Sequence, residues 1–136
     1  MKYSFLWSTP NARAPIITIA PYGITFNSAT VELLGKPKRL MIGYDEKSKV
    51  VGMKPINDDA NSKSFEFIKK ERNGYVRIGN KDFIKYLINK KEIDFKIRNT
   101  YKYIADWDSD DELLIIDLTN PMDDFDSSND TESDDD

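Results

Sequence analysis

Residues 16–35 read IITIAPYGITFNSATVELLG and carry the strongest structural signal in the chain. The apolar, β-branched run IITIA predicts a strand, PYG predicts a tight turn, and ITF predicts a second short strand. Asn27 or Ser28 then caps a short helix over residues 29–34, and Gly35 stands at its C-terminal end. The predicted order is therefore strand, turn, strand, capped helix.

The same kinds of pattern continue on both sides of this stretch. A second predicted helix follows Asn80, which we expect to cap it, and its apolar side consists of Phe83, Ile84, Leu87 and Ile88. Further strands are predicted from apolar or alternating runs at residues 3–7, 40–44, 50–54, 64–70, 75–78, 93–98, 101–107 and 113–118.

The order of the predicted elements recurs, which suggests a duplicated unit. Residues 16–55 and 64–118 each read as strand, tight turn, short strand, capped helix and hairpin. We expect the two units to share one core in a small, barrel-like, mainly β domain (a β-rich α+β fold) over residues 1–118. A β meander with two incidental helices is the alternative interpretation.

The repeated unit resembles a known family. The run Ile16-Ile17-Thr18-Ile19, a glycine turn, Ile24-Thr25-Phe26, a short helix and a hairpin over residues 39–54 are similar to the AbrB-type swapped-hairpin unit. Two such units in one chain resemble MraZ-type proteins or a double-psi barrel, and the resemblance implies DNA binding. The organisation also resembles small proteins of Gram-positive phages and mobile elements.

The charges of the chain are strongly segregated. All 20 lysines and arginines lie within residues 2–102, which contain 10 acidic residues, so this part has a net charge of +10. Residues 103–136 contain 14 acidic and no basic residues. Residues 119–136 are too poor in apolar side chains to bury a core, so we predict a disordered acidic C-terminal tail on a basic domain. A purely solubilising tail is the alternative.

The composition argues against several kinds of active site. The chain has no cysteine and no histidine, which removes disulfides, thiolate zinc sites, cysteine nucleophiles and the commonest general base. The spacing of Asp106, Asp108 and Asp110 matches the start of a calcium-binding EF-hand loop. Asp111, however, stands where that loop requires glycine, so a hairpin turn explains these residues better. We therefore predict no enzyme, no cofactor and no metal site.

The basic residues offer a candidate binding surface. Lysine and arginine side chains neutralise nucleic-acid phosphates, and exposed tyrosines stack on bases. The tyrosines singled out for stacking are Tyr44, Tyr75, Tyr101 and Tyr103. The predicted phosphate-binding residues are Lys36, Lys38, Arg39, Lys69, Lys70, Arg72, Arg77, Lys90, Lys91, Lys96 and Arg98. Because the lysines after the two helices occupy matching places in the two units, we expect two basic patches side by side. Simple solvation of strand faces and helix ends is the competing interpretation.

The sequence thus predicts a non-enzymatic nucleic-acid-binding protein, with DNA as the favoured ligand. Its role would be accessory or regulatory, and a phage is one possible origin of the protein. The acidic tail would compete with nucleic acid for the basic surface. The alternative is a protein-interaction module that inhibits a host nucleic-acid enzyme, with the tail imitating DNA. Residues 1–10 are too short and polar for a signal peptide, and no apolar run approaches 18 residues, so we expect a cytoplasmic protein without membrane spans. An oligomer is compatible with these features.

Overall fold

The β-branched run at residues 16–20 and the short run after it form a tight antiparallel hairpin. Strand β1 (Ile16–Ala20) pairs with β2 (Gly23–Phe26), so that Ile17 faces Phe26 and Ala20 faces Gly23. A Cβ atom on Gly23 would lie 2.7 Å from the carbonyl oxygen of Ile78 on a neighbouring strand. Only glycine therefore allows this close approach of two backbones.

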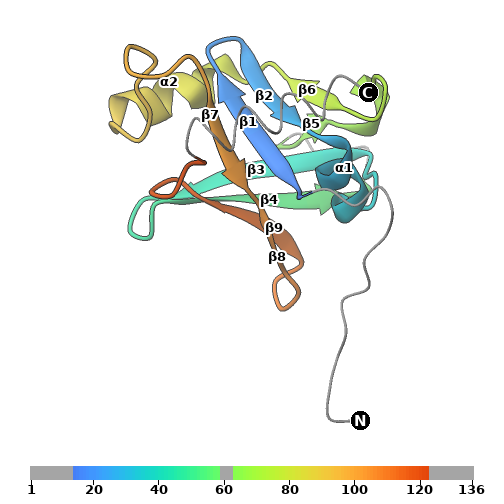
Figure 1. Ribbon diagram of the computed structural model, residues 1–136. Helices are drawn as coiled ribbons and strands as arrows, with labels where there is room; N and C mark the ends of the chain where they lie inside the picture. The colour runs from blue at the N-terminus through green and yellow to red at the C-terminus, as the bar shows by residue number, and fades with distance from the viewer. Residues whose placement is uncertain (1–13, 59–62, 123–136) are drawn as a thin grey trace.

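The computed structural model describes residues 14–58 and 63–122, which form two antiparallel sheets (Figure 1). The predicted strand at residues 3–7 and the acidic segment from residue 123 onward lie outside the described residues. The remaining elements are α1 (Ser28–Leu34), β3 (Arg39–Asp45), β4 (Val50–Ile56), β5 (Phe65–Glu66), the 3₁₀ helix η1 (Ile68–Lys70), β6 (Val76–Ile78), α2 (Lys81–Asn89), β7 (Tyr101–Ile104), β8 (Asp106–Asp108) and β9 (Leu113–Asp117).

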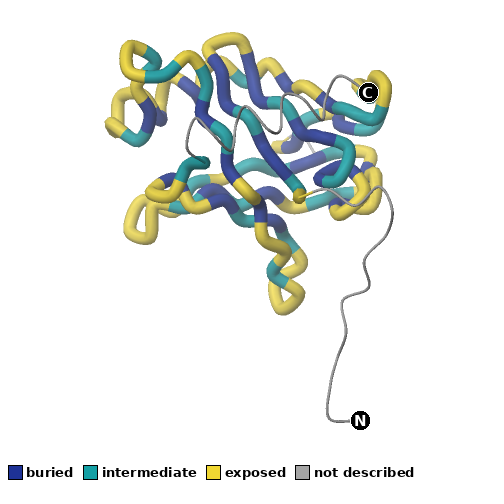
Figure 2. Tube along the Cα trace, in the orientation of Figure 1, coloured by how far each residue is buried: buried dark blue, intermediate teal, exposed yellow. Residues whose placement is uncertain are grey.

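The two sheets enclose the hydrophobic core. Sheet A has the strand order β6-β2-β1-β7, and sheet B has the order β5-β3-β4-β9-β8. Alternate residues of both sheets point inward, and the core joins side chains such as Ile17, Phe26 and Tyr103 of sheet A to Leu40 and Met53 of sheet B. Figure 2 shows this buried band running between the sheets, with exposed residues concentrated at the turns. No helix within the described residues is long and apolar enough to span a membrane.

A buried asparagine joins the first hairpin to the first helix. Of the two predicted caps, Asn27 and Ser28, it is Asn27 that caps α1: its Oδ1 accepts from Thr30 N at 3.0 Å and from Thr30 Oγ1 at 2.7 Å. The same oxygen accepts from Ile16 N at 3.0 Å, and Asn27 Nδ2 donates to Ala14 O at 3.0 Å. One side chain thus satisfies backbone groups at the start of β1 and at the start of α1.

The predicted strand over residues 64–70 is wrong for most of its length. Only β5 pairs with β3, and the chain then turns into η1, with Phe67 fully buried against the ring of Phe26 at 5.1 Å. Ile68 N still donates to Pro37 O at 3.1 Å. Proline has no N–H to return a ladder bond, so the pairing cannot continue past this point.

The predicted strand over residues 93–98 is also wrong. Ile93 is buried but Ile97 is 76% exposed, although strict alternation would place both on one face. Asp94 Oδ1 accepts from Lys96 N at 2.9 Å, and Asp94 O accepts from Ile97 N at 3.0 Å. An aspartate that binds the backbone just after it favours a turn over a strand.

The predicted barrel is also wrong, because the strands form two separate sheets. Each sheet keeps two edge strands, β6 and β7 in sheet A and β5 and β8 in sheet B, so the sheets do not close on each other. The chain passes from β7 to β8 at Ala105 without pairing one sheet to the other. The fold is therefore mainly β, with two sheets packed face to face.

The sheet topology agrees with the proposed repeat only in part. Strand β2 pairs with β6 and β4 pairs with β9, so these equivalent elements are neighbours. However, β1 belongs to sheet A while β5 belongs to sheet B, and α1 leads into sheet B while α2 leads into sheet A. Duplication of the unit stays a prediction.

Replacing Asn27 with alanine should strongly destabilise the protein. Loss of a helix cap costs about 1 kcal/mol and a buried unpaired amide about 1–3 kcal/mol, so we expect Asn27→Ala to lower the free energy of unfolding by about 2–4 kcal/mol. Asn80 also precedes a helix but makes no side-chain capping bond, so Asn80→Ala is the matched control. Urea unfolding measures both variants, and equal losses would show that Asn27 has no special role.

Candidate nucleic-acid interface

Three of the predicted phosphate-binding residues line one hollow of the surface. This basic hollow has a volume of about 480 Å³ and is lined by Lys38, Arg39, Glu66, Ile68 and Lys69. Its residues come from the start of β3, from β5 and from η1, so two segments that are far apart in the sequence form its walls.

Backbone hydrogen bonds hold the walls of the basic hollow together. Phe67 N donates to Lys38 O at 2.9 Å, and Arg39 pairs with Glu66 in the sheet register. The buried Phe67 ring sits in the core behind them. The positions of Lys38 and Lys69 therefore depend on the turn that replaces the predicted strand.

Arg39 is held by its surroundings and does not point freely into solvent. Its Nε donates to Ser64 Oγ at 2.6 Å and its Nη2 donates to Ser64 O at 2.7 Å. Ser64 itself is buried. Arg39 thus anchors the segment before β5 and contributes a fixed positive charge to the hollow.

Three further predicted residues are close in sequence to those that line the hollow. Lys36 forms an exposed ion pair with Glu32 at 3.1 Å, an arrangement that contributes little stability and that a ligand can displace at little cost. Arg72 Nη1 donates to Glu71 O at 2.7 Å, and Lys70 is exposed on η1. Six of the eleven predicted residues therefore lie at this end of the molecule.

Arg77 belongs to a different surface, the outer face of sheet A. In the register of the sheet, Arg77 pairs with Thr25, Thr25 with Thr18, and Thr18 with Lys102. These four side chains form one row across all four strands, with a cation at each end. The Arg77 guanidinium also stacks 5.0 Å from the ring centroid of Tyr22. Lys102 and Tyr22 were not among the predicted site residues, because only strand pairing brings Lys102 into this row and Arg77 to the ring of Tyr22.

The remaining predicted residues lie at the opposite end of β3. Lys90, just after α2, forms an ion pair at 3.0 Å with Glu46 in the β3–β4 turn. The next residue, Lys91, has a left-handed backbone conformation. Lys96 is exposed in the turn after α2, and Arg98 Nη1 donates to Met122 O at 2.9 Å. A seven-residue strand spans about 20 Å, so the expected pair of adjacent basic patches is not formed.

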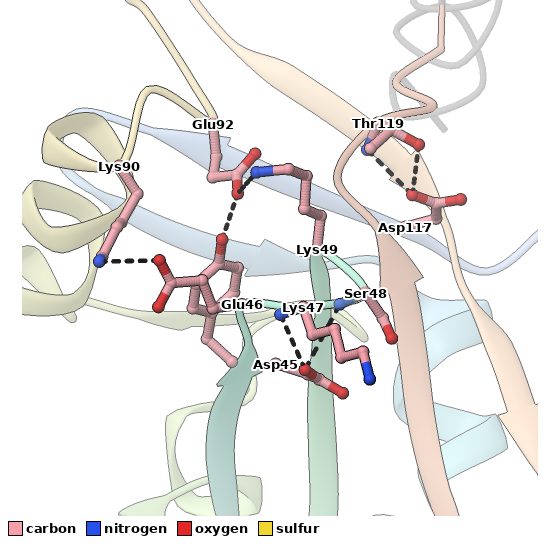
Figure 3. Close-up of polar contacts among 10 residues, drawn as sticks. Asp45, Glu46, Lys47, Ser48, Lys49, Lys90, Glu92, Asp117 and Thr119 are labelled. Atoms are coloured by element: carbon pink, nitrogen blue, oxygen red, sulfur yellow. Dashed lines mark hydrogen bonds and ion pairs between the residues drawn. The ribbon is translucent and has the colours of Figure 1, made fainter.

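Glu46 neutralises Lys90 of this second cluster, and a second ion pair, between Glu92 and Lys49, lies beside it. Figure 3 shows Glu92 reaching toward Lys49, and Lys90 toward Glu46, at the turn between β3 and β4. The Glu92 side chain is only 7% exposed, lies 3.2 Å from Lys49 Nζ, and accepts a hydrogen bond from Tyr44 Oη. This arrangement fixes the β3–β4 turn against the end of α2. Its physical role is structural.

Three of the four tyrosines predicted to stack on bases are buried or engaged by a neighbouring side chain, and the fourth, Tyr75, is half-buried. Tyr101 and Tyr103 are buried in the core at 8% and 1% exposure, and Tyr44 donates to Glu92. Burial raises the pKa of Tyr103, while the hydrogen bond to Glu92 raises the pKa of Tyr44 to about 12. Among the tyrosines of residues 14–58 and 63–122, the exposed ones are Tyr22 on the β1–β2 turn and Tyr86 on α2.

The acidic sequence at residues 106–112 forms the hairpin turn that we expected. Asp108 Oδ1 accepts from Asp110 N at 3.0 Å and from Asp111 N at 3.3 Å, and β8 pairs with β9 on either side. Within residues 14–58 and 63–122, no group of three or more acidic side chains is placed to hold a metal ion.

Comparison of the chain with protein-family models, with curated proteins and with solved structures finds no match in any of the three.

The Tyr44–Glu92 contact should make stability depend on alkaline pH. A tyrosine whose pKa is raised in the folded state stabilises that state below pH 10, and this contribution is lost as the pH rises through about 12. We therefore expect Tyr44→Phe to be less stable than the unsubstituted protein at pH 8, and the difference to shrink between pH 10 and 12. Urea unfolding across this range measures it. Tyr103 is common to both proteins, so a difference that stays constant with pH would contradict the role given to Tyr44.

Proposed function

We propose that this protein binds nucleic acid without catalysing a reaction, and that the basic hollow is the centre of its binding surface. The observation that carries the proposal is the convergence of Lys38, Arg39 and Lys69 on one concave surface from segments distant in sequence. Lys36, Lys70 and Arg72 are exposed within two residues of Lys38 or three of Lys69 in the sequence and add positive charge to this part of the surface. Clustered cations of this kind supply most of the non-specific affinity for phosphates.

The geometry favours contact with the sugar–phosphate backbone. A hollow of about 480 Å³ has the size of a small-molecule pocket, which suits one or two nucleotide units. Ile68 lines it beside the cations and offers an apolar surface to a sugar or a base. Tyr22 and Arg77 on sheet A supply a second platform for a single strand. Such a surface supports the proposal that the protein binds DNA in an accessory or regulatory role.

Charge removal at the basic hollow should weaken binding more than the same change elsewhere. We expect the triple variant Lys38→Ala, Lys69→Ala, Lys70→Ala to bind DNA more weakly, and by a similar factor for unrelated DNA sequences. The log–log salt slope should become shallower by about 0.9 for each duplex phosphate that the protein no longer neutralises, or about 0.7 on single strands. Fluorescence anisotropy with labelled oligonucleotides at several salt concentrations measures both quantities.

The matched control removes three lysines from the other end of β3. Lys47→Ala, Lys90→Ala and Lys91→Ala change the net charge by the same amount but leave the basic hollow intact. If both triple variants lose equal affinity, net charge alone explains the binding and the hollow is not the site. If the unsubstituted protein has no measurable affinity for DNA at low salt, the proposed function is wrong.

The acidic C-terminal segment is proposed to act as an internal competitor for the basic surfaces. The first residues of the predicted tail are attached to the domain: Thr119 N donates to Asp117 Oδ1 at 2.9 Å, and Met122 N donates to Lys102 O at 2.7 Å. The segment after Met122 contains eight acidic residues and no basic residue. It therefore leaves the domain beside Lys102 and Arg98, at the edge of sheet A. Its 14 residues can reach about 45 Å when extended, whereas four strands span only about 14 Å.

Truncation after Met122 should tighten DNA binding. Loss of a tethered anionic competitor should raise the affinity at low salt, and the gain should fade as salt screens both interactions. The melting temperature should hardly change, because the contacts of residues 119–122 remain. Weaker binding of the truncated protein, measured by the same anisotropy assay, would rule out competition by the tail.

One structural observation favours the alternative of a protein-interaction module. The β8–β9 hairpin projects from the body in Figure 1, and its residues 106–112 include five acidic side chains, Asp106, Asp108, Asp110, Asp111 and Glu112. A projecting row of carboxylates can imitate phosphates toward a basic protein. Nuclease treatment distinguishes the two functions, since partners recovered from a lysate through nucleic acid disappear and direct protein partners persist.

A further inference from the structure

The outer face of sheet B contains two glycines that lie opposite each other on adjacent strands. Gly43 of β3 pairs with Gly52 of β4, Gly52 pairs with Ile115 of β9, and Ile115 pairs with Asp106 of β8. We call this row and the flanking Met41, Val50 and Leu113 the glycine face. It is the face opposite to the one that carries the core residues Leu40, Val51, Met53, Leu114 and Ile116.

The backbone does not require glycine at these two positions. Neither Gly43 nor Gly52 has a positive φ. A Cβ on Gly43 would meet no atom within 4 Å, and a Cβ on Gly52 would make only ordinary contact with Leu113 at 3.8 Å. Glycine weakens the interior of a strand, and where neither a turn nor crowding explains it, it marks close approach by another group.

Four side chains around the glycines are apolar and only half-buried, and one neighbour is charged: Lys54 pairs with Met41, and its Nζ donates to Asp111 O at 3.1 Å. Met41, Val50, Leu113 and Ile115 border the depression, and none of them is buried in the core. Acidic residues lie at its margins: Asp45 and Asp117 pair with Val50 from either side, and Asp106 ends the glycine row. An apolar depression with an acidic margin suits an apolar or aromatic segment that carries positive charge.

The chain enters the described structure at one end of this row. Pro15 O accepts from Ala105 N at 2.9 Å, and Ala105 directly precedes Asp106. Residues 1–13 therefore join the domain beside the glycine face. They contain Lys2 and Arg13 and no acidic residue.

The sequence and length of this segment match the depression. Tyr3, Phe5 and Trp7 recur at every second residue, so in an extended conformation their rings share one side. The seven residues from Trp7 to Ala14 span about 23 Å when extended, and the row of four strands spans about 14 Å. An aromatic side chain of the segment can thus reach Gly43 and Gly52, and aromatic rings commonly cover glycines in sheets.

We propose that residues 3–7 of the same chain dock on the glycine face and place an aromatic ring over Gly43 and Gly52. This docking covers the apolar outer face of sheet B. It does not depend on the proposed nucleic-acid binding: Arg39 of the basic hollow lies on the same side of sheet B, two residues before Met41, but the glycine row itself contains no residue of the hollow. An acidic occupant such as the C-terminal segment is disfavoured by the carboxylates of Asp45, Asp106 and Asp117.

Fluorescence of Trp7 tests the docking in the full-length chain without nucleic acid. The chain has two tryptophans, so Trp107→Phe leaves Trp7 as the only reporter. We expect Trp7 emission to be blue-shifted and its quenching by iodide to be several-fold weaker than that of a free tryptophan peptide. Both effects should be independent of protein concentration.

Gly43→Lys in the Trp107→Phe background should release the segment, because a long charged side chain then fills the depression. The open space above Gly43 lets this variant fold, and Gly52→Thr is a second blocking variant with a smaller side chain. Ser48→Thr, in the β3–β4 turn, is the control that should leave Trp7 protected. Circular dichroism confirms that each variant is folded.

Two results would overturn the proposal. Equal iodide quenching of Trp7 with and without Gly43→Lys would show that the segment does not lie on the glycine face. Protection that appears only as the protein concentration rises, together with dimers in sedimentation velocity, would assign the face to the segment of a second copy.

Discussion

The side-chain amide of Asn27 is the contact on which the rest of the structure depends. It is 4% exposed, and its four hydrogen bonds join the first residues of β1 to the first turn of α1. Without it, a strand amide and a helix amide would be buried without partners, which is costly in a protein interior. This contact sets the direction in which α1 leaves the first hairpin, and so the point at which β3 enters sheet B.

The position of the basic hollow follows from that geometry. α1 ends at Gly35 and leads through Pro37 into β3, so Lys38 and Arg39 come to the start of sheet B. Pro37 then limits the pairing with β5, and Phe67 turns inward to pack on Phe26 of the first hairpin. Lys69 reaches the hollow only because of this turn. A packing constraint in the core therefore positions the surface charges that we propose to bind phosphates.

The two outer faces of the molecule differ in character. The outer face of sheet A has a polar row with Arg77 and Lys102 at its ends, whereas the outer face of sheet B is apolar around Gly43 and Gly52, with aspartates at its margin and Arg39 and Lys54 toward the start of β3. The two chain ends join the domain at these faces in a complementary way. The cationic, aromatic residues 1–13 enter beside the acidic apolar face, and the acidic residues after Met122 leave beside Lys102. The same charge segregation that is visible along the sequence thus recurs in the arrangement of surfaces.

Local signals in the sequence were sufficient for the elements that depend on neighbouring residues. The β-branched run before the Gly23 turn, the capped helix ending at Gly35, the β3–β4 hairpin and the acidic turn at Asp108 were all predicted, because each is stabilised by contacts within a few residues. Tertiary structure decided the rest. Phe67 packs on Phe26 in the core, so the predicted strand over residues 64–70 ends early. Asp94 accepts a hydrogen bond from Lys96 N, so residues 93–98 form a turn and Ile97 is exposed. Arg39 was predicted to bind phosphate, but its Nε donates to Ser64 Oγ. The sequence also did not show that Lys38 and Lys90 lie at opposite ends of β3. Sequence alone showed which residues carry charge, but only strand pairing decided which of those charges share a surface, because register joins residues that are far apart in sequence.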